Sequence, residues 1–184
     1  MTLSVVCMRC LSWPTQAADW PTRHRKYSWP DSSTVDLVVN NGCDVVRKAH
    51  HRCIPDERMR HKHHRLSLSR AEIVLLNSWT QVQQIVYHML RVFLKTERLT
   101  DSASNSDAAT LNNYHVKTLT LWACELKPKS WWIDDLNIVR LSVELLNTLG
   151  VWLTDTRCKH YFIHNCNEVS PAHTNNISYT LRLV

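Results

Sequence analysis

The chain has 184 residues, of which 44% are hydrophobic, so it is long and apolar enough to bury the core of one domain. With only 2 glycines and 6 prolines, the composition argues against a glycine-rich phosphate loop and against a turn-dense all-β fold. The formal net charge of +6, with 11 histidines besides, suits polyanionic partners: nucleic acid, nucleotide phosphates or anionic lipid. A basic domain without any such partner is the open alternative.

Cysteine usage and hydropathy bear on the compartment. The 7 cysteines are odd in number and irregularly spaced, and the N-terminal segment lacks the charged head of a secretory signal. No apolar stretch reaches the roughly 18 residues that a membrane-spanning helix needs. We therefore expect a protein of the reducing cytoplasm, or of the nucleus, without a membrane partner.

The N-terminal third shows short patterns. Residues 3–7 (LSVVC) predict a short strand, for which no later segment is an obvious partner. A Trp- and Pro-rich stretch at 12–31 favours extended and turn geometry, and Asp31 can cap a short helix within 34–42. Residues 43–64 carry no regular pattern, and we expect an irregular loop with a basic, histidine-rich end.

The remainder predicts helices. Ser69 precedes Glu72 by the spacing of a capping box, which predicts the start of a helix that runs to about residue 79. A longer helix is expected at about 80–98, and its predicted buried face consists of Val82, Ile85, Val86, Met89, Leu90 and Phe93. A polar loop follows at 101–110.

Two more long helices complete the expected fold. The first spans about 111–126, with a buried stripe of Leu111, Thr118, Leu119, Trp122 and Leu126. The second has its apolar stripe at Leu136, Val139, Val143, Leu146 and Leu153, with Gly150 near its end. The predicted fold class is mainly α: a helical bundle with one short N-terminal strand.

Metal-binding and catalytic patterns are weak. The histidines and cysteine of one segment lack the paired spacings of a zinc site, which favours a solvated basic loop; they are His50, His51, Cys53, His61, His63 and His64. The carboxylates are scattered, so no two-metal set is recognisable. We assign no catalytic residue, metal ligand or cofactor to the chain. Arg58, Arg60 and Lys62 form a weak candidate patch for nucleic acid or another polyanion.

Two polar turns could bind an anion. The first turn lies at the start of the helix expected at 111–126 and consists of Asn112, Asn113, Tyr114, His115 and Lys117. A helix N-terminus favours anions, and a tyrosine ring can stack on a base. In the other turn, Arg65 comes just before Ser67 and Ser69. The guanidinium and the two hydroxyls together could bind a phosphate. Capping and surface charge explain the same residues more simply, and both interpretations stay open.

Several separated blocks occur in an order that resembles one known family. They are WPTQAADW, WP, NNGCDVV, RLSLSRAE, QQIVYHML, YHVKTLTLWACE, a tryptophan pair and RCKHYFIHNCN. From about Trp13 to Asn167 the chain resembles the C-terminal helical half of the cyclic GMP-AMP synthase and Mab-21-like family. The resemblance implies a division into a remnant of a nucleotidyltransferase lobe (1–11), a helical domain (12–167) and a divergent tail (168–184).

The resemblance also implies a function. Full-length relatives hold ATP or GTP with Mg²⁺ or Mn²⁺ between two lobes, and active ones make a cyclic dinucleotide messenger in innate immunity after binding double-stranded nucleic acid. The nucleotide contacts carried over to this chain are Arg65, Ser67, Ser69, Asn113, Tyr114 and Lys117. Tyr114 would stack on the base, and Arg65 would contact the nucleotide.

Departures from the family pattern limit that expectation. Ser4 stands where relatives carry the third metal-binding carboxylate, and the catalytic lobe before it is missing. Val86 replaces a phosphate-binding lysine, His64 replaces a tryptophan, and no zinc thumb separates the helices. The chain alone is thus expected not to catalyse, and to self-associate through an exposed inter-lobe face. The alternatives are a non-enzymatic module that binds nucleic acid, nucleotide or protein, and a poorly folded gene fragment.

Overall fold

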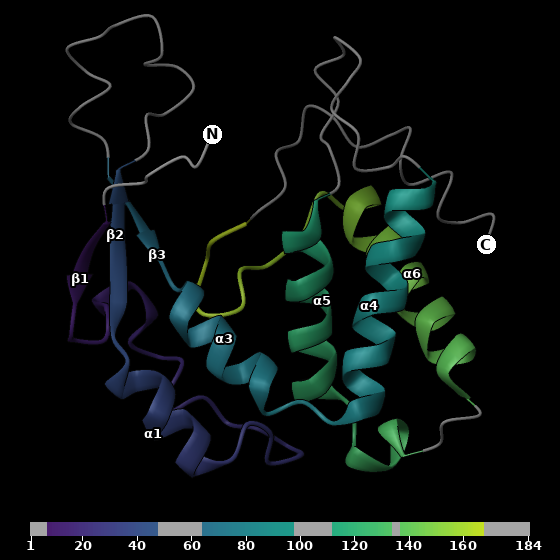
Figure 1. The fold of residues 1–184 in the computed structure, drawn as a ribbon, viewed down its shortest axis with the longest axis horizontal. Helices are drawn as coiled ribbons and strands as arrows, with labels where there is room; N and C mark the ends of the chain where they lie inside the picture. Colours follow the sequence, from purple (N-terminus) through teal and green to yellow (C-terminus); the bar gives the residue numbers. More distant parts are fainter. Residues whose placement is uncertain (1–6, 48–63, 98–111, 134–136, 168–184) are drawn as a thin grey trace, which may run out of the picture. The chain divides into compact units, whose positions relative to one another are not determined.

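The computed structural model describes residues 7–47, 64–97, 112–133 and 137–167 (Figure 1). Their contacts divide the chain into two compact units. The first unit holds the described residues up to Ser78, apart from the short segment Arg23–Trp29. That segment belongs to the second unit, which resumes at Trp79.

The first unit contains an antiparallel sheet in the order β1 (Cys7–Cys10), β2 (Cys43–Arg47), β3 (His64–Ser67) (Figure 1). In its register Cys10 pairs with Cys43, and Asp44 pairs with Ser67. The expectation of an irregular loop over 43–64 is therefore wrong at both ends of that range, and the strand that begins at Cys7 does have a partner. These strands have only 4 or 5 residues, too few for an alternating pattern to be recognised in the sequence.

Gly42 makes the sharp entry into β2 possible. Its φ of +61° lies in the left-handed region. A Cβ at this position would collide with the carbonyl oxygen of Cys10 and lie 2.8 Å from the carbonyl carbon of Leu11. Any larger residue would therefore push the start of β2 away from the end of β1.

Two α-helices accompany the sheet in the part of the first unit that the structure describes. Helix α1 (Ser32–Asn40) is capped as expected by Asp31, whose carboxylate accepts a 2.8 Å hydrogen bond from the Thr34 amide. Helix α3 (Ser69–Asn77) packs against α1 and β2. The predicted capping box is wrong: Leu68 is the cap, and the Ser69 hydroxyl lies 2.8 Å from that of Ser67 instead.

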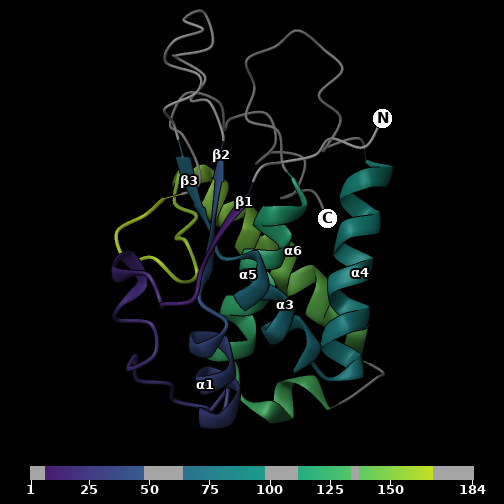
Figure 2. The same cartoon turned by 60° about the vertical axis from the view of Figure 1, so that its left-hand side comes forward.

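Among its described residues, the second unit is a bundle of three long helices. Helices α4 (Gln81–Thr96), α5 (Asn113–Leu126) and α6 (Ile138–Thr154) lie side by side in both views (Figures 1 and 2), and each packs against the other two. A short 3-10 helix at Lys129–Trp132 follows α5. The mainly α fold class is thus confirmed, with a larger sheet than expected.

The predicted buried stripes are right in part. On α4, Val82, Val86 and Leu90 are buried as expected, whereas Met89 is 38% exposed. Leu126 at the end of α5 and Val139 at the start of α6 are exposed, at 61% and 66%. Residues near a helix end have fewer neighbouring elements to cover them, so the 3.6-residue period alone overstates their burial.

Hydropathy adds one finding about the membrane. Within the described ranges, no helix is both long enough and apolar enough to cross a bilayer.

Candidate functional site

The polar turn that begins α5 is partly a helix cap. The side-chain oxygen of Asn112 accepts hydrogen bonds from the amides of Tyr114 (2.9 Å) and His115 (3.3 Å). In return, Nδ1 of His115 accepts a 3.2 Å hydrogen bond from the Asn112 amide. This is a reciprocal capping box in which histidine takes the place of the usual glutamate or glutamine. Asn112 and His115 are therefore used to start the helix.

Two cations, Lys117 and Arg91, lie beside the remaining residues of this turn, Tyr114 and Asn113. Lys117 Nζ is 5.3 Å from the ring centroid of Tyr114, a cation–π distance. The side-chain oxygen of Asn113 accepts a 3.3 Å hydrogen bond from Nε of Arg91 on α4. Tyr114 and Lys117 are half-buried, and Asn113 is exposed. The α5 turn, defined here as Asn113, Tyr114, Lys117 and Arg91, thus joins an aromatic ring to two positive charges at a helix N-terminus.

Sequence reasoning missed Arg91, and a local signal for it existed. Arg91 follows Tyr87 by one helical turn on α4, and its guanidinium carbon lies 5.4 Å from the Tyr87 ring centroid. An arginine four residues after a tyrosine on a helix can rest its guanidinium on the tyrosine ring, which fixes its position. Its approach to Asn113 joins residues that are 22 positions apart, so only the packing of α4 on α5 reveals it.

His160 places a second ring beside Tyr114, with centroids 6.2 Å apart. Its Nδ1 accepts hydrogen bonds from the amides of Phe162 (3.0 Å) and Ile163 (3.1 Å), so a neutral imidazole carries its proton on Nε2. Asn167 closes this loop, since its side-chain oxygen accepts a 2.7 Å hydrogen bond from the Cys158 amide. The sequence predicts no regular structure for this loop and no role for His160.

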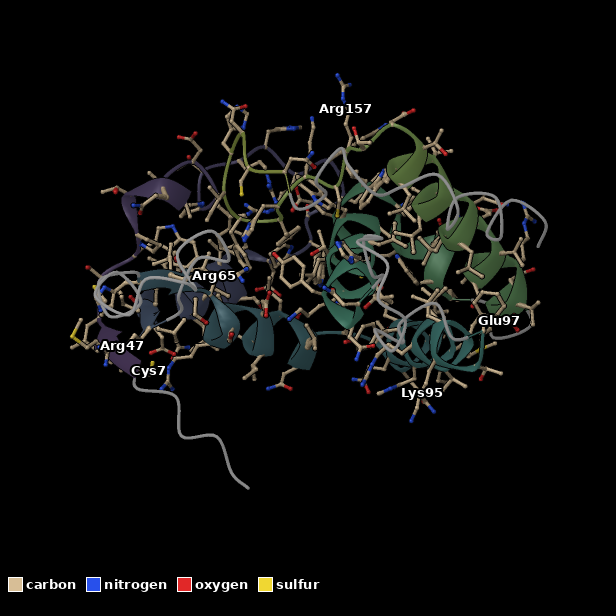
Figure 3. The ribbon with its side chains drawn as sticks, turned by 90° about the horizontal axis from the view of Figure 1, so that it is seen from above. Cys7, Arg47, Arg65, Lys95, Glu97 and Arg157 are labelled. Atoms are coloured by element: carbon tan, nitrogen blue, oxygen red, sulfur yellow. The ribbon has the colours of Figure 1, made fainter. Side chains whose placement is uncertain are left out.

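The other predicted contacts lie in the first unit. Arg65 and Ser67 are on β3, where Arg65 pairs with Val46 of β2 and is exposed (Figure 3). Ser69 is the first residue of α3. The hydroxyls of Ser67 and Ser69 lie 2.8 Å apart, so the two serines do come together.

Several predicted positions fall outside the described residues. They include Ser4, the patch of Arg58, Arg60 and Lys62, and the histidine and cysteine cluster except His64. Val86 is described, and its 0% exposure shows that this position faces the core. Across the described ranges, no three His, Cys, Asp or Glu side chains gather as a metal ion would require.

The LWACE block at the other end of α5 forms a buried ionic network. Glu125, which is 3% exposed, receives hydrogen bonds on the same oxygen from Arg23 (2.6 Å) and from the Tyr161 hydroxyl (2.7 Å). Nε of Arg25 lies 3.6 Å from that oxygen. Burial and the Glu125 charge hold the pKa of Tyr161 well above its ordinary value.

Trp122 completes the network. The Arg23 guanidinium stacks 4.6 Å from the Trp122 ring centroid and 4.9 Å from that of Tyr161. Trp122 and Glu125 are three residues apart on α5 and so meet Arg23 together. The block therefore fixes the segment Arg23–Trp29 to the second unit, with two arginines set against the single Glu125 carboxylate.

Comparisons with known proteins identify the family. Residues 81–183 match the family model of the Mab-21 protein HhH/H2TH-like domain, and residues 1–78 match that of the Mab-21 protein nucleotidyltransferase domain. The first match alone covers more than half of the 184 residues, and the chain belongs to the Mab-21 family. One match ends at residue 78 and the other begins at 81, beside the division that contacts make between Ser78 and Trp79. The division into 1–11, 12–167 and 168–184 stays a prediction.

One relative shows how much of such a protein this chain represents. Protein male abnormal 21 of Caenorhabditis briggsae is 24% identical over 190 residues, which cover 99% of this chain and 49% of the relative. The chain thus spans about half the length of that relative.

Proposed function

We propose that this chain is part of a cyclic GMP-AMP synthase-like member of the Mab-21 family and that the α5 turn binds a nucleotide. The observation that supports this most is the arrangement at Tyr114, whose half-buried ring has Lys117 at 5.3 Å and, through Asn113, Arg91 nearby. A tyrosine face stacks on any base. Two cations at a helix N-terminus attract the phosphates of the same molecule.

Arg65, Ser67 and Ser69 are proposed as further nucleotide contacts. Their assignment rests on the family resemblance, and the close approach of the two serine hydroxyls gives a phosphate oxygen two adjacent donors. It is tested separately from the α5 turn by Arg65→Ala, which should weaken nucleotide binding.

We propose that the chain by itself binds nucleotide without transferring it. Metal-assisted transfer needs carboxylates that hold Mg²⁺ or Mn²⁺ against the triphosphate. Two described carboxylates are already committed: Asp44 to Arg70 at 2.9 Å, and Glu125 to the buried network. Joined to a lobe that supplies the metal ligands, the same residues would hold a triphosphate for cyclic dinucleotide synthesis in innate immunity, as the resemblance implies. Incubation with ATP, GTP and either metal should give no cyclic dinucleotide, and its formation would contradict this part.

A titration of the chain with ATP and with adenosine tests the α5 turn. Tyr114→Ala should weaken binding of both ligands at least about fivefold, because stacking contributes about 1–3 kcal/mol per base. Lys117→Ala should weaken binding of ATP and leave adenosine unchanged, because the lysine acts on the phosphates. Equal affinities in wild type and Tyr114→Ala would overturn the assignment.

The chain offers a matched control for this experiment. Tyr27 is also half-buried in the second unit and also has a lysine, Lys26, at 5.3 Å from its ring centroid. Tyr27→Ala therefore removes the same kind of pair away from the α5 turn. It should leave the affinity for both ligands unchanged.

A second candidate function is binding of nucleic acid by a module without enzymatic activity. The net charge of +6 favours it, and the predicted patch of Arg58, Arg60 and Lys62 would carry it. Binding of double-stranded DNA or RNA should then fall steeply as salt rises, and reversal of all three charges to glutamate should flatten that dependence. An unchanged salt slope in a variant that keeps its circular dichroism would exclude the patch.

A further inference from the structure

A pair of thiols faces each other across the sheet of the first unit. Cys10 is the last residue of β1, Cys43 is the first residue of β2, and the two are direct partners in the antiparallel register. Both are free. Opposed residues of antiparallel strands have Cα atoms about 4.5–5.5 Å apart, which lies within the range that a disulfide spans.

Ser12 holds both sulfur atoms near one point. Sγ of Cys10 lies 3.2 Å from the Ser12 hydroxyl, and the Cys43 thiol donates a 3.8 Å hydrogen bond to the Ser12 carbonyl oxygen. Gly42 allows this crowding, because a side chain there would collide with the Cys10 carbonyl. Each thiol also affects the pKa of the other, as neighbours do.

We infer that Cys10 and Cys43 are a reversible oxidation site that closes into a cross-strand disulfide with a low-molecular-weight disulfide such as oxidised glutathione as oxidant. The Cys10 thiolate attacks one sulfur of oxidised glutathione, which forms a mixed disulfide and releases one glutathione thiolate. Cys43 loses its proton to solvent and attacks the Cys10 sulfur, which releases the second glutathione. The two protein thiols are oxidised, and one glutathione disulfide is reduced to two thiols.

The environments of the two thiols assign their order of reaction. Cys10 is half-buried, and hydrogen bonds from Ser12 lower its pKa, so it is the more reactive thiol. Cys43 is 2% exposed, and burial raises its pKa, so it reacts only with a sulfur that is already beside it. A glutathione thiolate that attacks the half-buried Cys10 sulfur reopens the disulfide, which makes the closure reversible.

Tryptic mapping after equilibration of the whole chain in glutathione buffers tests the site. Trypsin cleaves after Arg9, so Cys7 and Cys10 fall on different peptides, and Cys43 lies on peptide 27–47. After free thiols are alkylated, we expect the peptide 10–23 linked to 27–47, and its complete loss on reduction. The linkage should be several-fold more abundant from the folded chain than from the chain oxidised in urea.

Three serine variants separate the roles. Cys10→Ser should abolish the linkage, and Cys43→Ser should leave Cys10 as a persistent glutathione adduct. Cys7→Ser, on the same strand (Figure 3), is the matched control and should not change the yield. Full alkylation of both wild-type thiols at the most oxidising ratio, a glutathione adduct that never resolves, or linkage of Cys10 to another cysteine would each overturn the inference.

Discussion

The two ends of α5 use polar residues in opposite ways. At its N-terminus Asn113, Tyr114 and Lys117 are exposed or half-buried around a helix cap, whereas at its C-terminus Glu125 is buried against Arg23 and Tyr161. Tyr114, Lys117 and Glu125 all belong to the sequence block YHVKTLTLWACE, which resembles the family as one unit. Resemblance alone therefore does not separate these two environments, whereas burial and ionic pairing do.

Loss of the Glu125 charge should have the largest effect. Glu125→Gln leaves Arg23 and Arg25 without a buried counter-charge, and removal of one partner of a buried ion pair costs about 3–5 kcal/mol. Urea unfolding followed by circular dichroism measures this loss. Glu144→Gln is the control, because the pair of Glu144 with Arg140 lies on the surface and should contribute at most about 1 kcal/mol. Equal losses in both variants would mean that the buried network contributes no more than a surface ion pair.

The Tyr161 hydroxyl should contribute less. Tyr161→Phe removes one hydrogen bond to a buried carboxylate and should cost about 1–3 kcal/mol in the same unfolding assay. A cost near zero would mean that Arg23 and Arg25 alone satisfy Glu125.

The same hydroxyl predicts a dependence on alkaline pH. The folded-state pKa of Tyr161 is raised above its unfolded value of about 10, so its contribution to stability is complete below that pH. The contribution is lost as the pH rises through the folded-state pKa. An ultraviolet titration should show one tyrosine that ionises late, and this component should disappear in Tyr161→Phe. A component that is unchanged in the variant would refute the assignment.

The smallest effect is expected at the cap. Asn112→Ala removes the acceptor for two amides and should cost about 1 kcal/mol, with Asn112→Asp as the conservative variant that keeps the cap. Because this cap also orders the turn that carries Tyr114, nucleotide affinity should fall together with stability. A fall in affinity without any loss of stability would place Asn112 itself in contact with the ligand.

Helix positions were predictable because their signals are local. The spacing of Val82, Val86 and Leu90 predicted α4, and Asp31 predicted the start of α1. The sheet was missed because β1 and β2 are short and pair across more than 30 residues, as in Cys10 with Cys43. Strand pairing at that distance depends on how the intervening residues bring the chain back to β1, which no local sequence pattern encodes.

The candidate site divides in the same way. Asn113, Tyr114 and Lys117 occupy one helical turn, so a single segment of sequence predicted them together. Arg91 and His160 reach that turn from other elements and were missed. The Glu125 network was missed for the same reason, since Arg23 lies 102 positions away from its partner.

That long separation has a consequence for how the protein can be dissected. A fragment that begins at Trp79 contains Glu125 and Tyr161 but lacks Arg23 and Arg25, so it would carry a buried, uncompensated carboxylate. The second unit is therefore discontinuous in the sequence. Its folding must close a loop of chain that includes the strands β2 and β3 of the first unit. Synthesis cannot complete the second unit until the chain has passed Tyr161, which lies 138 positions after Arg23, so this arginine meets its partners only late.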